Sequence, residues 1–318
     1  MTDRVPLALF TYNRPLHTQR ALDALRRNAR FGDVSIIIYS DAPKRPEHAE
    51  AVDATRRIVT EWAAEHRAEI VTRHQNLGLA RSIAGSVDEL TRAYGRVIVL
   101  EDDLVAAPDF LRFMLEGLER YADTASVAQI AGCLLTGSAD VPGDAFFMPL
   151  TTTWGWATWT RAWRLFDWST DGLLDALAAD AGFRSRFNLD YVADYQSMLS
   201  DRIAGKNDSW GILWWYAVAR ANAQVLYPRM SLVWNGGFDN SGVHCAGDLP
   251  FQPEAPPQFR SSNLPAELRM PDSAEPNMAA FADVCSFLRG GTGAVPPATQ
   301  KGIVARSLRK LRRHWSGR

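Results

Sequence analysis

The sequence is short of cysteine and has no long uninterrupted apolar run. Its three cysteines, Cys133, Cys245 and Cys285, are odd in number and widely spaced, so they predict neither a disulfide framework nor a zinc cluster. A reducing compartment is the simpler expectation. No signal-peptide core follows Met1, and no stretch is long enough to span a bilayer. We therefore expect a cytoplasmic protein.

A strong net charge is missing as well. The 35 Lys and Arg against 36 Asp and Glu leave a formal net charge of −1, which gives no electrostatic reason to expect nucleic acid as a partner. Basic residues gather only behind Val295. A helix over residues 303–315 would carry an apolar face within this basic tail, as is typical of a helix on an anionic membrane surface. A disordered basic tail or an oligomer contact explains the same pattern equally well.

Two glycine-rich motifs are absent behind the first expected strand. The segment Thr11-Tyr12-Asn13-Arg14-Pro15 stands there, and it contains neither the GxGxxG of a dinucleotide-binding dehydrogenase nor a glycine-rich basic phosphate loop. The first absence argues against a Rossmann dehydrogenase, and the second argues against a nucleotidyltransferase.

The first hundred residues alternate regularly between strand and helix patterns. Apolar, β-branched runs predict strands over residues 5–10, 34–39, 69–72 and 96–100. Helices are expected from Pro15, with a stripe that includes Leu16, Leu22 and Leu25, and over residues 47–66 and 79–94. This alternation predicts βαβ units and a mainly parallel α/β sheet flanked by helices. The later expected elements are a helix over 108–121, strands over 126–131, 145–149 and 225–228, a helix pair within 172–224, and an extended segment over 250–276.

Four polar clusters follow apolar strands or open helices in this pattern, at residues 11–14, 41, 76–81 and 101–103. Ligands of parallel α/β sheets bind at the carboxyl ends of the strands. We therefore expect these four clusters to share one rim of the sheet and to form the binding site.

Glu101-Asp102-Asp103 is the motif in this rim with the clearest chemistry. Three carboxylates at the end of a buried strand repel one another unless a cation or a hydrogen-bond network compensates them. Mn²⁺ or Mg²⁺ shared with a diphosphate would do so and would neutralise charge on a leaving diphosphate. The alternative is an acidic loop that ends in a helix cap near Asp109.

In this motif the sequence resembles glycosyltransferases of GT-A fold. Residues 97–104 with Ala107-Pro108-Asp109-Phe110 resemble the metal-binding segment of N-acetylglucosaminyltransferase I, an inverting enzyme. The order of several phrases resembles bacterial sugar transferases grouped with family 2 still more closely. Those phrases are Phe10-Thr11-Tyr12-Asn13-Arg14-Pro15, Asn76-Leu77-Gly78-Leu79-Ala80-Arg81-Ser82-Ile83, Trp154-Gly155-Trp156-Ala157-Thr158-Trp159 and Asn240-Ser241-Gly242-Val243-His244-Cys245. The resemblance covers about residues 5–245.

The resemblance implies a role for each matching position. Asp103 would bind the metal, and Glu101 and Asp102 would face the donor sugar or ribose. Arg14 would contact the nucleotide, and Asp41 would accept the imide N–H of uracil. The remaining donor-site residues would be Thr11, Asn13, Asn76 and Arg81. Two alternatives stay open: Asp41 as a turn residue before Pro43, and Arg81 as an ordinary exposed helix residue.

Two further positions are a catalytic base and a second metal ligand. The resemblance places an Asp before a Trp, here Asp208 before Trp210, as the base that takes the acceptor hydroxyl proton. Asp194 and Asp201 are the next carboxylates to consider, and Asp208 or Ser209 could instead be the N-cap of the following helix. His244 is a candidate metal ligand, a diphosphate contact or a plain loop residue.

The tryptophans between residues 154 and 234 have two interpretations. Trp154, Trp156 and Trp210 are placed in an acceptor or sugar pocket, with Gly155 permitting close backbone approach. The alternative is core packing between the two halves of the chain, and the two interpretations can hold for different residues.

These inferences predict a metal-dependent, inverting glycosyltransferase that moves a hexosyl or N-acetylhexosaminyl group from a UDP-sugar to a saccharide or lipid-linked glycan, in surface polysaccharide or lipopolysaccharide synthesis. Residues 1–125 would form the nucleotide-sugar-binding half and 126–248 the acceptor-binding half, with 249–318 as a Pro-rich extension and basic tail. The alternatives are a nucleotidyltransferase and a non-catalytic carbohydrate- or nucleotide-binding module.

Overall fold

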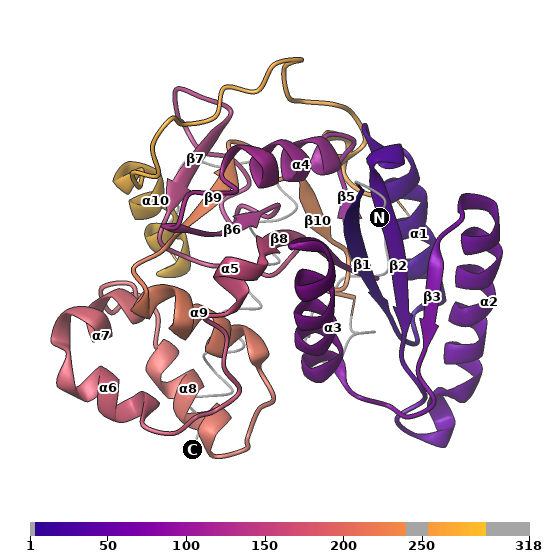
Figure 1. Cartoon of the computed structure of the whole chain (residues 1–318), viewed down its shortest axis with the longest axis horizontal. Coiled ribbons are helices and arrows are strands. Elements are labelled where there is room, and N and C mark those ends of the chain that lie inside the picture. The colour runs from indigo at the N-terminus through magenta and orange to yellow at the C-terminus, as the bar shows by residue number, and fades with distance from the viewer. Residues whose placement is uncertain (1–3, 240–253, 291–318) are drawn as a thin grey trace.

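The computed structural model describes residues 4–239 and 254–290. Its main sheet has eight strands in the order β3-β2-β1-β4-β8-β6-β9-β7, and β5 and β10 form a separate two-stranded sheet (Figure 1). The strands are β1 (Val5–Thr11), β2 (Val34–Ser40), β3 (Glu69–Thr72), β4 (Arg96–Glu101), β5 (Leu104–Ala106), β6 (Val127–Ala131), β7 (Ala145–Met148), β8 (Trp156–Trp159), β9 (Gln224–Pro228) and β10 (Val233–Asn235).

The first half of the chain has the predicted α/β architecture. Strands β3, β2, β1 and β4 pair in parallel, which confirms the expected fold class. The connecting helices are α1 (Pro15–Arg26), α2 (Ala49–His66) and α3 (Leu79–Tyr94). Pro15 opens α1, where its missing N–H is no loss, and Gly95 ends α3 with a left-handed φ of 79°. The apolar stripe predicted for α1 is wrong at Leu16, which is 63% exposed.

The second half is joined to the first by a strand that sequence analysis did not predict. β8 pairs antiparallel with both β4 and β6. It therefore closes the gap between the parallel strands and the β6-β9-β7 group. Four residues are too few for hydrophobic periodicity to distinguish a strand from a helix turn, so this segment showed only as an aromatic block.

A lobe of short helices covers the second half of the sheet (Figure 1). Its members are α5 (Thr160–Trp163), α6 (Leu173–Ala179), α7 (Ala181–Phe187), α8 (Tyr195–Ile203) and α9 (Trp210–Arg220). Helix α4 (Phe110–Arg120) lies on the other side of β6 and β8 from α6 to α9 (Figure 1). Its core is aromatic: the ring of Trp156 lies within 6.3 Å, centroid to centroid, of Trp163, Trp210 and Trp214. The Trp156 ring therefore joins β8 to the helices of the lobe.

The described C-terminal segment is attached to the domain rather than separate from it. Residues 254–276 contain only the short turn η3 (Pro257–Phe259), and α10 (Met278–Leu288) follows. Sequence analysis missed α10. Asp109 anchors the segment, because its carboxylate accepts hydrogen bonds from the Ser262 hydroxyl and from the backbone N–H groups of Asn263 and Leu264. Burial alone would raise the pKa of Asp109, but these bonds outweigh it and lower the pKa.

Within the described residues, none of the helices combines the length and the apolar character needed to cross a bilayer.

Two glycines, Gly132 and Gly155, allow the start of β8 to pack closely against β10. Gly155 has a φ of 63°, and a Cβ there would lie 2.7 Å from a Val233 methyl. Gly132, opposite, donates its N–H to the Gly155 carbonyl at 2.7 Å. The close approach expected from Gly155 is thus present, and it serves packing against β10.

We predict that Gly155→Ala destabilises the fold by about 2–4 kcal/mol. The left-handed φ costs about 1–2 kcal/mol for an L residue, and the contact with Val233 adds overpacking. Gly172→Ala is the matched control, because Gly172 also has a left-handed φ, of 68°, but a Cβ added there would meet no atom within 4 Å. Chemical denaturation of both variants measures the difference. Equal losses would contradict a packing role for Gly155.

Candidate active site

The acidic triplet lies on a tight turn between two short strands. Glu101 ends β4, Asp102 and Asp103 form the turn, and β5 follows at once. The register aligns Glu101 with Phe10 at the end of β1. The acidic residues therefore meet the segment that leaves β1, as expected for carboxyl ends of parallel strands.

Arg14 compensates this acidic turn. One guanidinium nitrogen donates to the Asp102 carboxylate at 2.6 Å, and the other donates to Asp103 at 3.1 Å. The second oxygen of Asp102 accepts the backbone N–H of Tyr12 at 3.1 Å. Asp102 and Asp103 are only 3% and 6% exposed. The pair is buried, and burial makes each charge dependent on its partner.

The pKa shifts follow from burial and from the signs of the neighbours. Burial raises the pKa of Glu101 to about 8, and the negative charges of Asp103 and Asp102 add to this against the pull of Arg14. Burial also raises the pKa of Asp102, although Arg14 opposes the shift. For Arg14, burial would lower the pKa, but Asp102 and Asp103 outweigh it and raise the pKa.

Helix α1 contributes two further groups that sequence analysis missed. His17 and Arg20 follow Arg14 at intervals of three residues, so all three share one helix face. The His17 ring lies 3.2 Å from the Asp239 carboxylate, and burial lowers its pKa. The Arg20 guanidinium lies 4.7 Å from the centre of the Trp234 ring, and burial lowers its pKa to about 10. The three-residue spacing was the signal that could have identified them.

The loop behind β10 closes over the acidic turn. Gly236 donates its backbone N–H to the Asp103 carbonyl at 2.9 Å. A Cβ on Gly237 would stand 2.3 Å from the Asp103 carboxylate, and one on Gly236 would stand 2.0 Å from the Arg20 guanidinium. Both positions therefore require glycine as long as these charged groups keep their places.

Asp41 and Asn76 join two loops on the same rim. The carboxylate of Asp41 accepts the backbone N–H groups of Ala42, Leu77 and Gly78 at 2.9–3.2 Å. The Asn76 amide donates to the Ala42 carbonyl at 2.7 Å. Asp41 thus positions the start of α3 in addition to following β2. Arg81 lies exposed on α3.

Thr11 and Asn13 are the remaining predicted site residues at the end of β1, between the acidic turn and the Asp41 loop. The Thr11 hydroxyl is buried and donates to the Tyr39 carbonyl at 3.3 Å. Its backbone carbonyl accepts the Asp41 N–H at 3.2 Å. Asn13 is partly exposed between Tyr12 and Arg14. The four predicted polar clusters therefore do gather at one rim of the sheet.

The tryptophans divide between core and site. Trp156 is fully buried and Trp210 is 6% exposed, so both belong to the aromatic core, and their placement in a sugar pocket is corrected. Trp154 is partly exposed, and its ring lies 5.7 Å from that of Phe238. Since Phe238 follows Gly237, Trp154 is the predicted tryptophan that stands beside the acidic turn.

Asp208 is not the cap of α9. The hydroxyl of Ser209 accepts the Ile212 N–H and fills that role, while Asp208 is exposed immediately before it. Helix α9 begins next to Thr153, since a Cβ on Gly211 would lie 3.8 Å from the Thr153 methyl. The sequence neighbours Thr153 and Trp154 thus connect the start of α9 to the loop over the acidic turn. Asp194 caps α8, and Asp201 pairs with Lys206 at 3.0 Å.

Of the two predicted metal ligands, Asp103 is described and His244 lies outside the described residues. Among residues 4–239 and 254–290, no three His, Cys, Asp or Glu side chains converge as a ready metal site. The reason is geometric: the turn points Asp102 and Asp103 toward Arg14. The oxygen donors themselves suit a hard divalent cation. Asp102, Asp103 and Asp239 outnumber Arg14 and Arg20, so the site retains an excess of negative charge that a cation would neutralise.

The chain is similar to glycosyltransferases in sequence and in fold. The family model described as glycosyl transferase family 2 matches residues 7–171, and no curated protein matches the chain. Similar solved structures include glucosyl-3-phosphoglycerate synthase from Mycobacterium tuberculosis with Mn²⁺ and UDP (13% identity over 51% of this chain and 58% of that one, TM-score 0.32). They also include S. aureus TarS (11% identity over 99% of this chain and 44% of that one, TM-score 0.40). A third is mouse xyloside xylosyltransferase 1 (13% identity over 68% of this chain and 80% of that one, TM-score 0.36). The chain thus spans 58% of the synthase and 44% of TarS.

We predict that Arg14→Gln destabilises the protein by about 3–5 kcal/mol in a chelating buffer, because it leaves two buried carboxylates without their cation. Arg92→Gln is the control: it breaks the exposed Arg92–Asp88 pair, which is worth about 0.3–0.5 kcal/mol. Urea denaturation measures both. Similar losses in the two variants would show that the acidic turn does not depend on Arg14.

Proposed function

Because the chain belongs to glycosyl transferase family 2, we propose that it moves a hexosyl or N-acetylhexosaminyl group from a UDP-sugar to a saccharide or lipid-linked glycan. The observation that carries this proposal is the acidic turn at the carboxyl end of β4. It faces Arg14 from the end of β1 and shares its rim with the Asp41 loop. A compact set of anionic and cationic groups at that rim suits a nucleotide diphosphate with a divalent cation.

Donor binding is assigned to the rim residues. Two of the five N–H donors of Arg14 bond to carboxylates, so the others can reach a diphosphate. The Asp41 carboxylate accepts three backbone N–H groups, and the Leu77 N–H is shared between its two oxygens. The imide N–H of uracil is proposed to take the place of one of these shared contacts. Trp154, whose ring lies 5.7 Å from that of Phe238, is proposed as an aromatic surface for the donor sugar.

The cation proposed for this site is Mn²⁺ or Mg²⁺. Asp103 would hold it with help from Asp102, consistent with the proposed likeness to the metal-binding segment of N-acetylglucosaminyltransferase I. When bound, the cation supplies Lewis-acid neutralisation of the departing diphosphate. Because Arg14 neutralises the same two carboxylates, Arg14 and the cation share the compensation of charge at the turn.

Asp208 is proposed as the general base of an inverting transfer. It takes the proton of the acceptor hydroxyl while that oxygen forms its bond to the anomeric carbon and the bond to the diphosphate breaks. Its exposure and the assignment of the helix cap to Ser209 support this role. A nucleotidyltransferase is the weaker candidate, because the loop behind β1 has no glycine with which to wrap phosphates.

We predict that UDP with Mn²⁺ raises the melting temperature and that Asp103→Asn abolishes the rise. A ligand at 100 times its Kd stabilises by about 2.7 kcal/mol through mass action. Asp53→Asn, on the exposed face of α2, is the control that keeps the shift. The panel should include the other nucleoside diphosphates and a chelator. Absence of a shift with every nucleotide would refute the proposed donor site.

We predict that Asp208→Asn lowers kcat by about 10²–10⁴-fold, the usual contribution of a general base, and leaves the UDP-dependent thermal shift unchanged. Asp194→Asn is the control, because Asp194 caps α8 and Asn caps a helix equally well, so kcat should stay at the wild-type value. Steady-state rates with the donor identified by the thermal panel give the comparison. An unchanged kcat in Asp208→Asn would assign the base elsewhere.

A further inference from the structure

A cavity lies at the opposite end of the main sheet from the acidic turn. Its volume is about 490 Å³, and Ser126 and Gln224 line it. Ser126 precedes β6, and Gln224 begins β9. Strand β6 runs parallel to β9, and it runs parallel to β4 because β8 is antiparallel to both. The cavity therefore lies at the amino ends of the strands, whereas Glu101 to Asp103 follow a carboxyl end.

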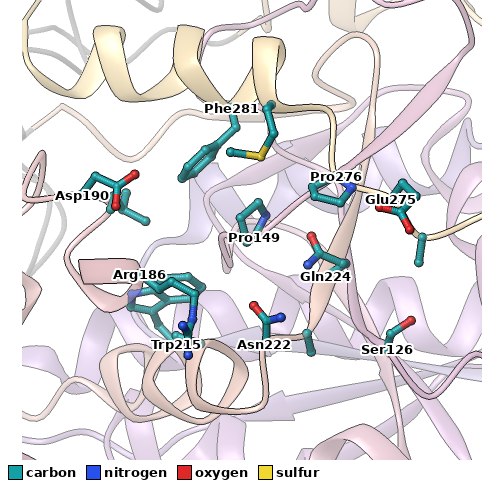
Figure 2. A pocket seen from close by; sticks show the side chains of 15 residues that line it. Ser126, Pro149, Arg186, Asp190, Trp215, Asn222, Gln224, Glu275, Pro276 and Phe281 are labelled. Atoms are coloured by element: carbon teal, nitrogen blue, oxygen red, sulfur yellow. The ribbon is translucent and has the colours of Figure 1, made fainter. Parts of the chain in front are cut away.

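The walls of this cavity combine apolar surfaces with polar groups. Trp215 comes from α9 and Phe281 from α10 on the opposite wall, and the two amides of Asn222 and Gln224 face the space between them (Figure 2). A volume of this size holds a small molecule, and apolar walls with a few oriented polar groups are the usual character of such a site. Aromatic faces cover the C–H side of a sugar ring, and amides both donate to and accept from hydroxyl groups.

Gln224 carries an unsatisfied amide oxygen beside the cavity. The residue is 8% exposed, and its buried amide oxygen has no hydrogen-bond partner among the residues that the structure describes. A buried acceptor without a partner costs about 1–3 kcal/mol. A turn of the side chain that brought this oxygen to the cavity surface would let a ligand hydroxyl supply the missing hydrogen bond.

The backbone on the cavity's rim is also unusual. Leu189, Asp190 and Tyr191 have consecutive left-handed φ values of 50°, 51° and 62°, which side chains other than glycine, asparagine and aspartate rarely adopt. Hydrogen bonds hold this turn, among them Asp190 N–H to the Ser185 carbonyl at 2.8 Å. Its effect is to bring Leu189 and Asp190 to the cavity wall.

The charges of the lining select against anions. Asp190 and Glu275 contribute two carboxylates, against the one guanidinium of Arg186. The excess negative charge disfavours phosphates, and so disfavours a nucleotide or a nucleotide sugar. A neutral ligand rich in hydroxyl groups matches these acceptors.

We propose that this cavity is a saccharide-binding site, separate from the donor site at the acidic turn. The assignment goes beyond the proposed transfer reaction, because it requires neither a nucleotide nor a cation. In a transferase that acts on a glycan, such a site would hold a part of the glycan far from the reacting end.

Saturation-transfer NMR with glucose, N-acetylglucosamine, maltotetraose and chitotetraose tests the proposal. At least one of these probes should bind the full-length protein without metal or nucleotide. Gln224→Leu and Asn222→Gly should each raise its Kd by about fivefold or more, the effect of losing one net hydrogen bond. Asn222→Gly keeps the φ of 51° without strain. Gln224→Leu should melt no lower than the wild type, since it removes a buried amide oxygen to which no described residue donates.

Asp103→Asn separates this site from the donor site. Saccharide binding that survives Asp103→Asn but weakens in Gln224→Leu and Asn222→Gly supports the proposal, whether or not UDP binds. Absence of binding for all four probes overturns it. Binding that is lost in Asp103→Asn and kept in both cavity variants also overturns it, because the saccharide would then occupy the donor site.

Discussion

The pairing of Arg14 with Asp102 and Asp103 is the constraint around which the rim of the sheet is arranged. Two carboxylates lie almost completely buried at the end of β4, where an uncompensated charge would be strongly destabilising. Compensation comes from the first turn of α1, so the ends of β1 and β4 must be neighbours. The parallel register of Phe10 with Glu101 provides that. Tyr12 completes the arrangement through its backbone N–H.

A segment from far along the sequence, β10 and the loop behind it, packs against this pairing. Strand β10 pairs with β5 and delivers Gly236 and Gly237 against Asp103, Arg14 and Arg20. Their lack of side chains allows backbone to approach charged groups at distances that a Cβ would forbid. The acidic turn is therefore enclosed by residues from both halves of the chain.

The aromatic core gives the second half its stability and leaves little aromatic surface for a ligand at the rim. Trp156, Trp163, Trp210 and Trp214 pack on one another, and Trp154 alone of the three predicted pocket tryptophans stays partly exposed. An aromatic surface of another kind occurs at the amino ends of β6 and β9, where Trp215 and Phe281 line the cavity. The two ends of the sheet thus differ in the groups they present: charged pairs dominate one, and side-chain amides between aromatic rings mark the other.

Local pattern alone determined much of the first half. The period of apolar residues predicted β1 to β4 and α1 to α3, and parallel pairing then required the polar residues behind those strands to share one rim. The carboxylates could be named as site residues, because several like charges behind a buried strand need compensation wherever they lie, whereas the role of Arg14 followed from the resemblance to glycosyltransferases.

Only the tertiary structure decided which partners those residues have. Arg14 contacts Asp102 and Asp103 across 88 or more positions, and Asp41 contacts Leu77 across 36, distances in sequence over which no local period carries information. Strands β8 and β10 are too short to show a hydrophobic period in the sequence. They form because β4 and β5 provide their hydrogen-bond partners. For Trp156, apolar character was evident from its residue type, but core and pocket differ only in what packs against the ring.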